Sequence, residues 1–225
     1  MTNTPSKITT LTYLLDPLCG WCYAVSPALE FLQKIEGIKI NIAPTGLFTG
    51  SGARKMDAEF GAYAWSNDER IEKLTGQHFS QAYRDEILGK PGQFDSGPLN
   101  TALTAVALTQ PAAELSTLHS LQHARYVLGL DTSDLHVVVQ VLEGLGQNEA
   151  AELLQNSDAE LLTSTKRRVD LSQQIAQQLG VRGVPKVAVH RGHGLDLHVL
   201  NTEWLLGPRE ALVSAVFTDI GTESV

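Results

Sequence analysis

Two cysteines separated by two residues, Cys19 and Cys22, are the only cysteines among the 225 residues of this chain. A chain that depends on disulfides for stability carries more cysteines, spaced further apart. A bridge across two intervening residues would also remove little entropy from the unfolded chain. The pair therefore indicates a reactive site, and it stands where a predicted strand gives way to a predicted helix.

The residues around the pair predict a strand, a helix and a second strand. Residues 8–15 and 38–43 contain alternating apolar and polar side chains rich in β-formers, which is typical of strands. Between them, residues 19–36 have apolar side chains at helical spacing, with a kink expected at Pro27 and an end at Gly37. A unit of this kind has parallel strands and a right-handed crossover.

The middle of the chain changes to helical patterns separated by Gly, Pro, Asn and Ser. The predicted helices cover residues 57–75, 78–88, 98–109, 111–128, 134–145 and 148–155. Four aromatic residues of the first two are expected to pack this segment onto the rest: Phe60, Tyr63, Trp65 and Phe79.

The last part of the chain predicts a long helix and an antiparallel hairpin. The helix covers residues 158–179 and ends at Gly180. Strands at 186–190 and 195–200 flank a turn at 191–194, and we expect this hairpin at the edge of the sheet. A final helix is predicted over residues 208–220.

Composition and charge narrow the classes of protein. The chain is 43% hydrophobic and 19% charged, which is ordinary for a soluble globular protein. A net charge of −8 argues against nucleic-acid binding, and we expect the cluster Lys166-Arg167-Arg168 to be a solvated helix face. No stretch approaches the roughly 18 apolar residues that span a membrane. The polar start lacks the features of a secretory signal, so we expect a cytoplasmic protein.

The spacing of the cysteines suits thiol–disulfide exchange. At a helix N-terminus, unpaired backbone N–H groups stabilise a thiolate, and the thiolate is the nucleophile. Cys19 occupies that end, so we expect it to be the nucleophile. Cys22, one turn further on, can reach the Cys19 sulfur and resolve a mixed disulfide within one molecule.

Metal and haem sites fit the sequence less well. A structural zinc site has four ligands, and the chain has no second cysteine pair. Haem attachment needs a histidine after the second cysteine, where Tyr23 stands. His119 and His123 share a helix face without the glutamate of the zinc-protease motif. We therefore predict no metal site.

These features together resemble the thioredoxin superfamily. The matching points are the sequence from Cys19 to Cys22 at the start of a kinked helix, the kink at Pro27, and Val184-Pro185 directly before a hairpin. The long helical segment makes the chain similar to the DsbA-like branch. The resemblance implies an α/β thioredoxin-like fold, a mixed sheet flanked by helices, with a large α-helical insertion. Residues 1–48 and 157–225 would form the thioredoxin-like domain, and residues 49–156 the inserted helical domain.

The resemblance also implies roles for residues outside the cysteine pair. In the family the proline corresponding to Pro185 is cis and faces the cysteines, so that the Val184 backbone meets an extended substrate strand. Trp21 would help to shape the same groove.

The chain departs from the family at two points. The Gly20-Trp21 dipeptide lacks the histidine of the strongly oxidising members, so we expect a less oxidising couple. The family often has a buried acid six residues before the first cysteine, where this chain has Tyr13. The group that deprotonates Cys22 therefore stays open, with Asp16 or a bound water as alternatives.

The leading hypothesis is a cytoplasmic thiol–disulfide oxidoreductase that mainly reduces or isomerises disulfides. It would need no cofactor beyond the Cys19–Cys22 couple, and its partners would be disulfide-containing or dithiol proteins, with glutathione open as a co-substrate. The chain would act as a monomer or a homodimer.

Two alternatives stay open. A relative of the same fold, the 2-hydroxychromene-2-carboxylate isomerase and kappa-class glutathione transferase group, implies a glutathione-dependent transferase or isomerase. A non-catalytic module that binds copper or zinc through Cys19 and Cys22 is the other.

Overall fold

The computed structural model describes residues 8–191 and 197–218. Its helices and strands follow one another as β1 (Thr9–Leu15), α1 (Gly20–Ala24), α2 (Ser26–Gln33), β2 (Ile38–Pro44), η1 (Gly50–Gly52), β3 (Arg54–Met56), α3 (Ala58–Thr75), α4 (Gln81–Tyr83), η2 (Arg84–Leu88), β4 (Gly92–Phe94), α5 (Gly97–Thr109), η3 (Pro111–Ala113), α6 (Glu114–Tyr126), α7 (Leu135–Gly144), α8 (Asn148–Asn156), α9 (Ala159–Gln178), β5 (Lys186–Arg191), β6 (Leu197–Leu200), α10 (Thr202–Leu206) and α11 (Arg209–Phe217).

The main sheet has four strands in the order β2-β1-β5-β6. β1 and β2 are parallel, with Tyr13 opposite Ile42. On its other side β1 pairs antiparallel with β5, which pairs antiparallel with β6. This confirms the mixed sheet and the position of the hairpin at its edge. The tip of the predicted turn, with His193, and the end of the predicted last helix lie outside the described residues.

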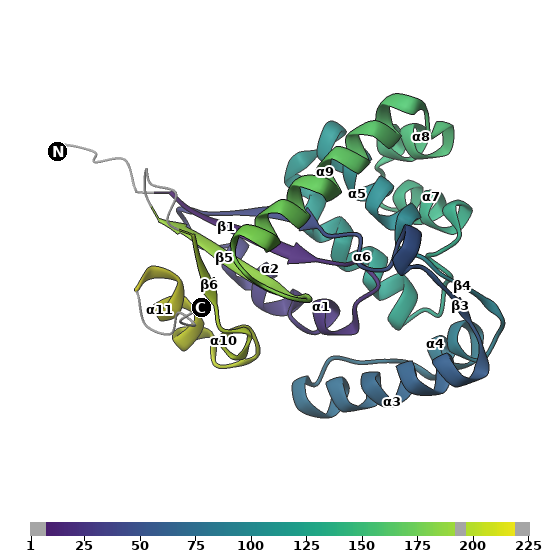
Figure 1. Cartoon of the computed structure of the whole chain (residues 1–225), viewed down its shortest axis with the longest axis horizontal. Helices are drawn as coiled ribbons and strands as arrows, with labels where there is room; N and C mark the ends of the chain where they lie inside the picture. The colour runs from purple at the N-terminus through teal and green to yellow at the C-terminus, as the bar shows by residue number, and fades with distance from the viewer. Residues whose placement is uncertain (1–7, 192–196, 219–225) are drawn as a thin grey trace.

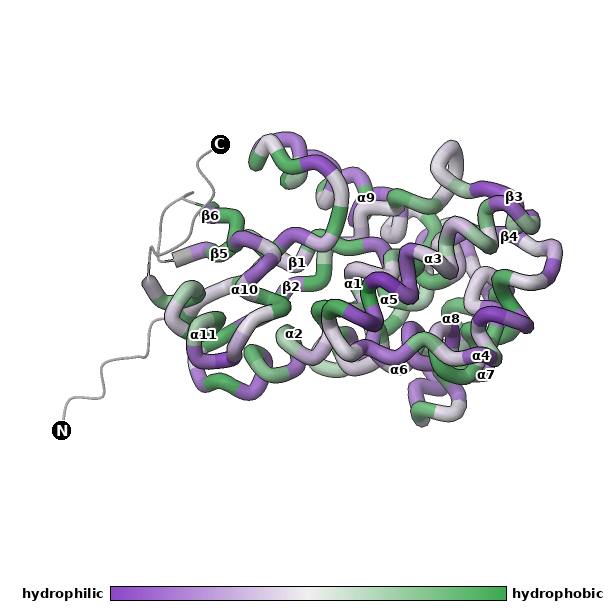
Figure 2. Tube along the Cα trace, turned by 90° about the horizontal axis from the view of Figure 1, so that it is seen from below, coloured by the Kyte–Doolittle hydropathy of each residue, from purple (hydrophilic) through white to green (hydrophobic). Residues whose placement is uncertain are grey.

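The helices of the middle segment gather at one end of the sheet. Figure 1 shows α3 to α8 on one side of the molecule and α10 and α11 on the other, and the view from below in Figure 2 agrees. Figure 2 shows hydrophilic and hydrophobic residues mixed along the chain in both parts. No helix of residues 8–191 and 197–218 is long and apolar enough to cross a membrane. We call residues 49–156 the insert, with the bounds expected from the sequence.

The helix after the cysteines is broken rather than kinked. α1 ends at Ala24, and α2 begins at Ser26 with Pro27 in its first turn. A proline in a first turn lacks only an N–H that would have no helical partner anyway, whereas inside a helix it removes a hydrogen bond. The prediction of one helix from 19 to 36 kinked at Pro27 was therefore wrong in detail, because two helices form with Val25 between them and the second ends at Gln33.

The helices predicted for the insert are present, but a small sheet was missed. β3 and β4 pair antiparallel, with Arg54 opposite Phe94. Each strand has three residues, which is too short for an alternating pattern to stand out in the sequence. This pair fixes Arg54 and the buried Phe94 near the cysteines.

Arg168 of α9 links the insert to the sheet, although the sequence predicted that this residue lies on a solvated helix face. Arg168 donates to the backbone oxygen of Ile42 in β2 over 2.8 Å and pairs with Glu114 of α6. The prediction of a solvated face was therefore wrong for Arg168. Its neighbour Lys166 does lie exposed, in an ion pair with Asp170 on its own helix.

Candidate active site

The two cysteines lie in unlike surroundings although only two residues separate them. Cys19 precedes the first residue of α1 with an extended backbone, and Cys22 is the third residue of that helix. Cys22 has no exposed surface, whereas Cys19 retains 9% and lines a pocket of about 390 Å³. Both are free thiols. Access from solvent therefore leads to the Cys19 sulfur.

The loop before β5 lies beside Cys19, although Val184 in that loop is 165 positions away in the sequence. The Val184–Pro185 peptide bond is cis. The Cys19 thiol points at the Val184 carbonyl, with 3.8 Å between Sγ and oxygen. Val184 lines the pocket together with Gly20 and Trp21, and the next residue, Pro185, is buried. The structure thus brings together the site residues that the sequence predicted from two distant segments.

Asp16 holds the loop that leads into Cys19. Its carboxyl oxygens accept hydrogen bonds from the backbone N–H groups of Leu18 (2.9 Å) and Phe48 (3.1 Å) and from the Ser96 hydroxyl (2.8 Å). Burial raises the pKa of Asp16, and these three hydrogen bonds oppose the rise. The side chain is fully buried, so Asp16 ties the cysteine loop to the segment after β2 and to the start of α5.

Cys22 is fully buried, and the phenol of Tyr13, also fully buried, lies beside its backbone. The Tyr13 hydroxyl donates to the Cys22 carbonyl over 3.0 Å. Burial, and then the neighbouring Cys19, raise the pKa of the Cys22 thiol well above its usual value. Burial also raises the pKa of Tyr13, so this phenol keeps its proton at neutral pH. Cys22 is therefore a protonated thiol unless a reaction at Cys19 changes its surroundings.

The pocket at Cys19 has two walls of different origin. The first, called the scaffold wall, consists of Leu18, Cys19, Gly20, Trp21, Leu47, Phe48, Gly183 and Val184. The second, called the insert wall, consists of Arg54, Phe60, Tyr63, Ala64, Asn67, Asp68, Tyr83, Phe94 and Tyr126. Five of the nine insert-wall residues are aromatic, so the insert gives the pocket an apolar lining.

Phe79 and Tyr63, two of the aromatic residues expected to pack the insert onto the rest, differ in how deeply they are buried. Phe79 is buried at 2% exposure, as expected, and stacks edge-on against Tyr23 of α1. Tyr63 is 70% exposed and lies at the pocket instead, so that prediction was wrong for it. A large exposed ring at the mouth of an apolar pocket is a contact that a ligand can use.

Asp68 is the site residue that sequence reasoning missed. Only 4% of it is exposed, and its Oδ2 accepts a hydrogen bond from the Tyr83 hydroxyl over 3.0 Å. Burial raises the pKa of Asp68 to about 7, against the opposing effects of Tyr83 and Arg125. The spacing of Asp68 along α3 could have revealed it, because Gly61, Asp68 and Ile71 recur at helical spacing and form the buried face of this helix.

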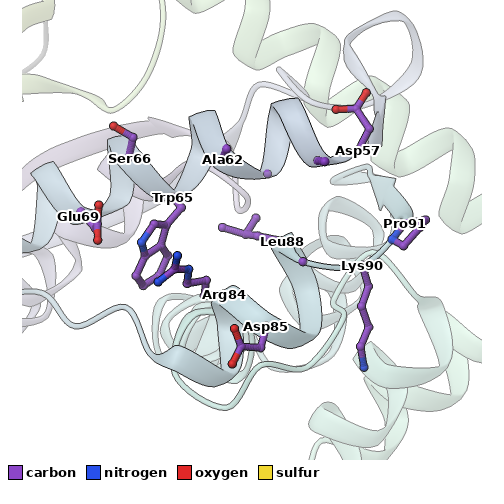
Figure 3. A pocket seen from close by; sticks show the side chains of 13 residues that line it. Asp57, Ala62, Trp65, Ser66, Glu69, Arg84, Asp85, Leu88, Lys90 and Pro91 are labelled. Carbon is purple, nitrogen blue, oxygen red and sulfur yellow. The ribbon is translucent and has the colours of Figure 1, made fainter.

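A larger pocket, of about 580 Å³, lies on the other side of α3 and does not include the cysteines. Figure 3 shows Trp65 and Glu69 of α3 facing Arg84 of η2, whose guanidinium lies 5.1 Å from the centre of the Trp65 ring. No sulfur atom lines it among the residues that the structure describes. Of these two pockets, the smaller is the one that Cys19 lines.

Within the described part of the chain, no group of three or more His, Cys, Asp or Glu side chains could hold a metal ion. The geometry instead defines a dithiol of unequal accessibility, facing a cis-proline loop on a thioredoxin-like sheet.

Comparison with known proteins identifies the family. Residues 10–202 match the DSBA-like thioredoxin domain, so the chain belongs to that family and is a thiol–disulfide oxidoreductase. The cytosolic disulfide reductase DsbM from Pseudomonas aeruginosa is 30% identical, with a TM-score of 0.81 over 94% of this chain and 98% of that one. A structure of DsbM with GSH superimposes with a TM-score of 0.79, at 30% identity over 93% of this chain and 100% of that one.

More distant structures share the fold alone. A Nitrosomonas europaea protein is 22% identical, with a TM-score of 0.73 over 94% of this chain and 96% of that one. A 2-hydroxychromene-2-carboxylate isomerase is 14% identical, with a TM-score of 0.50 over 84% and 87% of the two chains. No curated protein matches the sequence significantly.

Proposed function

We propose that this chain is a cytoplasmic disulfide reductase and isomerase in which Cys19 is the nucleophile and Cys22 the resolving thiol. The contrast between the two thiols supports this assignment most strongly: Cys19 lines the pocket, whereas Cys22 is fully buried. The similarity to DsbM, described as a cytosolic disulfide reductase, supports the direction of electron flow and the compartment.

The reaction has two exchange steps. The Cys19 thiolate attacks one sulfur of a substrate disulfide, forms a mixed disulfide, and releases the other sulfur as a thiolate that takes up a proton. Cys22 then loses its proton and attacks the Cys19 sulfur, which releases the substrate as a dithiol. Because burial raises the pKa of Cys22, it stays protonated until the mixed disulfide forms beside it. Two molecules of a thiol such as glutathione, leaving as its disulfide, would restore the Cys19–Cys22 dithiol.

The remaining site residues hold the substrate and the loop. The Val184 backbone and the Trp21 side chain line the groove in which an extended substrate would lie, and the buried Pro185 follows Val184. Gly20 leaves room for the insert to approach the pair, and Asp16 fixes the loop through its three hydrogen bonds.

The assignment of the cysteines is tested with insulin reduction and with a trap. We expect Cys19→Ser to abolish insulin reduction, because the exposed nucleophile is gone. Cys22→Ala should accumulate mixed disulfides on Cys19 in cells, and the trapped proteins would identify substrates and compartment. Unchanged insulin reduction by Cys19→Ser would contradict the role of Cys19. A reduction potential of about −120 mV, that of a strong oxidant, would contradict the proposed direction of electron flow.

A second candidate function is a glutathione-dependent transferase or isomerase acting on a small aromatic compound. The apolar insert wall supports it, as does the fold shared with 2-hydroxychromene-2-carboxylate isomerase. Glutathione-dependent turnover of an aromatic substrate that survives replacement of both Cys19 and Cys22 by serine would favour this candidate over the first.

A further inference from the structure

The carboxyl group of Asp68, which belongs to the insert, packs against Gly20 between the two cysteines. A Cβ atom added to Gly20 would lie only 2.5 Å from Asp68 Oδ1, so the carboxyl packs directly on the residue that follows Cys19. Asp68 and Cys19 line the same pocket. A nearly buried carboxyl group that lines the same pocket as a nucleophile is a candidate for proton transfer.

The surroundings of Asp68 leave one side of it open to the pocket. From α4, Tyr83 donates its hydroxyl to Oδ2, and Arg125 of α6 acts on the carboxyl electrostatically from behind the rings of Tyr83 and Phe94. The other ionisable groups on the pocket wall are Cys19, Arg54, Tyr63 and Tyr126.

The carboxyl and the phenol near Cys22, those of Asp16 and Tyr13, do not line this pocket. Asp16 and Tyr13 are fully buried and are absent from its lining. Along the part of the wall that the structure describes, Asp68 is the one carboxyl group. Among the described lining residues, Asp68 is therefore the carboxyl group available to a substrate sulfur that leaves Cys19 into this pocket.

We propose that Asp68 is the general acid that protonates the substrate sulfur leaving at Cys19, which deepens the proposed function and rests on it. When the Cys19 thiolate attacks, a sulfur–sulfur bond forms to Cys19 and the substrate's own bond breaks. The electron pair goes to the leaving sulfur, the Asp68 proton is transferred to it, and water in the open pocket returns a proton to Asp68. The same transfer serves the second sulfur, which leaves Cys19 when Cys22 attacks.

The environment of Asp68 suits this role at neutral pH. Burial raises its pKa to about 7, so a large fraction of the carboxyl keeps its proton where an ordinary aspartate is ionised. A general acid works best when its pKa lies near the operating pH. The acid should assist below that pKa and lose its effect as pH rises above it.

The test compares two disulfides with different leaving thiols. An alkyl disulfide, bis(2-hydroxyethyl) disulfide, releases a basic thiolate that needs a proton, whereas the nitrobenzoate disulfide DTNB releases a stable thiolate that does not. At pH 6 we expect Asp68→Asn to slow the reaction of the reduced protein with the alkyl disulfide by about 100-fold, and the reaction with DTNB by less than about threefold. The ratio of wild type to variant for the alkyl disulfide should approach one above pH 9.

Two further variants separate proton transfer from structure. Glu69→Gln removes the neighbouring acid on α3, which faces the other pocket, and should change neither rate. Tyr83→Phe removes a hydrogen bond that lowers the pKa of Asp68, so the acid-assisted reaction should extend to higher pH.

Equal slowing of both disulfides in Asp68→Asn, or no slowing of either, would overturn the proposal. A wild type that reacts with neither disulfide would instead contradict the proposed function itself.

Discussion

The two walls of the pocket at Cys19 differ in what they contribute. The scaffold wall provides the Cys19 sulfur and the Val184 backbone, both fixed by short motifs at the ends of secondary-structure elements. The insert wall provides aromatic rings and Asp68, which come from β3, α3, α4, β4 and α6. In the proposed mechanism the scaffold therefore carries the exchange reaction, whereas the insert lines the space that a substrate enters and contributes the ionisable carboxyl of Asp68.

The largest effect on stability is expected at the insert wall. The pKa of Asp68 is about 7 in the folded chain and near 3.8 when exposed. The folded state therefore binds the proton more tightly, and the carboxyl destabilises the fold increasingly as pH rises from about 4 to 7. Asp68→Asn should stabilise the protein at pH 8 by up to about 4 kcal/mol, the equivalent of that shift.

Urea unfolding at pH 8 and pH 4 measures this effect. At pH 4 the carboxyl is protonated in the folded chain, so the difference between wild type and Asp68→Asn should nearly vanish. Glu69→Gln, an exposed change on the same helix, should stay within about 0.5 kcal/mol of wild type at both values. A destabilised Asp68→Asn at pH 8 would show that the ionised carboxyl stabilises the insert wall instead.

The scaffold wall could be predicted from the sequence because its motifs are local. The spacing of Cys19 and Cys22 and the strand before them predicted a thiol at a helix start, and Val184-Pro185 before a hairpin predicted the facing loop. These features depend on a few consecutive residues each. The break at Val25 was missed because Pro27 is compatible both with a kinked helix and with a new first turn.

The insert wall could not be predicted in the same way, because its residues meet only through tertiary packing. Asp68 stands in a polar run of α3, and its partner Tyr83 belongs to another helix. The spacing from Gly61 to Ile71 marks a buried face, but it does not reveal that this face lies against Gly20. The burial of Asp16 could not be predicted either, because its hydrogen-bond partners Phe48 and Ser96 are distant in the sequence.

A substitution at Gly20 tests the contact between the two walls. An alanine Cβ would lie 2.5 Å from Asp68 Oδ1 and 3.0 Å from Ile71 Cδ1. We expect Gly20→Ala to destabilise the protein by about 1–3 kcal/mol through overpacking, although alanine favours a helix more than glycine does.

A double-mutant cycle gives the control for this prediction. In an Asp68→Ala background the carboxyl is absent, so Gly20→Ala should cost less than it does in wild type. Equal costs in the two backgrounds would mean that the cost does not come from Asp68 and arises at Ile71 instead.

A smaller effect is expected within the scaffold, at Tyr13. Tyr13→Phe removes the hydroxyl that donates to the Cys22 carbonyl, while the Ser26 hydroxyl still donates to it over 3.4 Å. The loss should cost about 1 kcal/mol of stability in urea unfolding. The rate of insulin reduction should stay within about twofold, because this phenol keeps its proton. A large fall in rate at nearly unchanged stability would make Tyr13 part of the proton transfer from Cys22.

The smallest effect is expected at the exposed edge of the insert wall, where Tyr63 offers its ring to a bound substrate. Tyr63→Ser should leave the unfolding free energy within about 0.5 kcal/mol of wild type, because the side chain is 70% exposed. It should raise KM for insulin about threefold and leave kcat unchanged, since the ring contributes to binding and not to the exchange step. Tyr63→Phe keeps the ring and should retain the wild-type KM. A fall in kcat with unchanged KM would place Tyr63 in the reaction itself, and the division between a reactive scaffold wall and a selective insert wall would fail there.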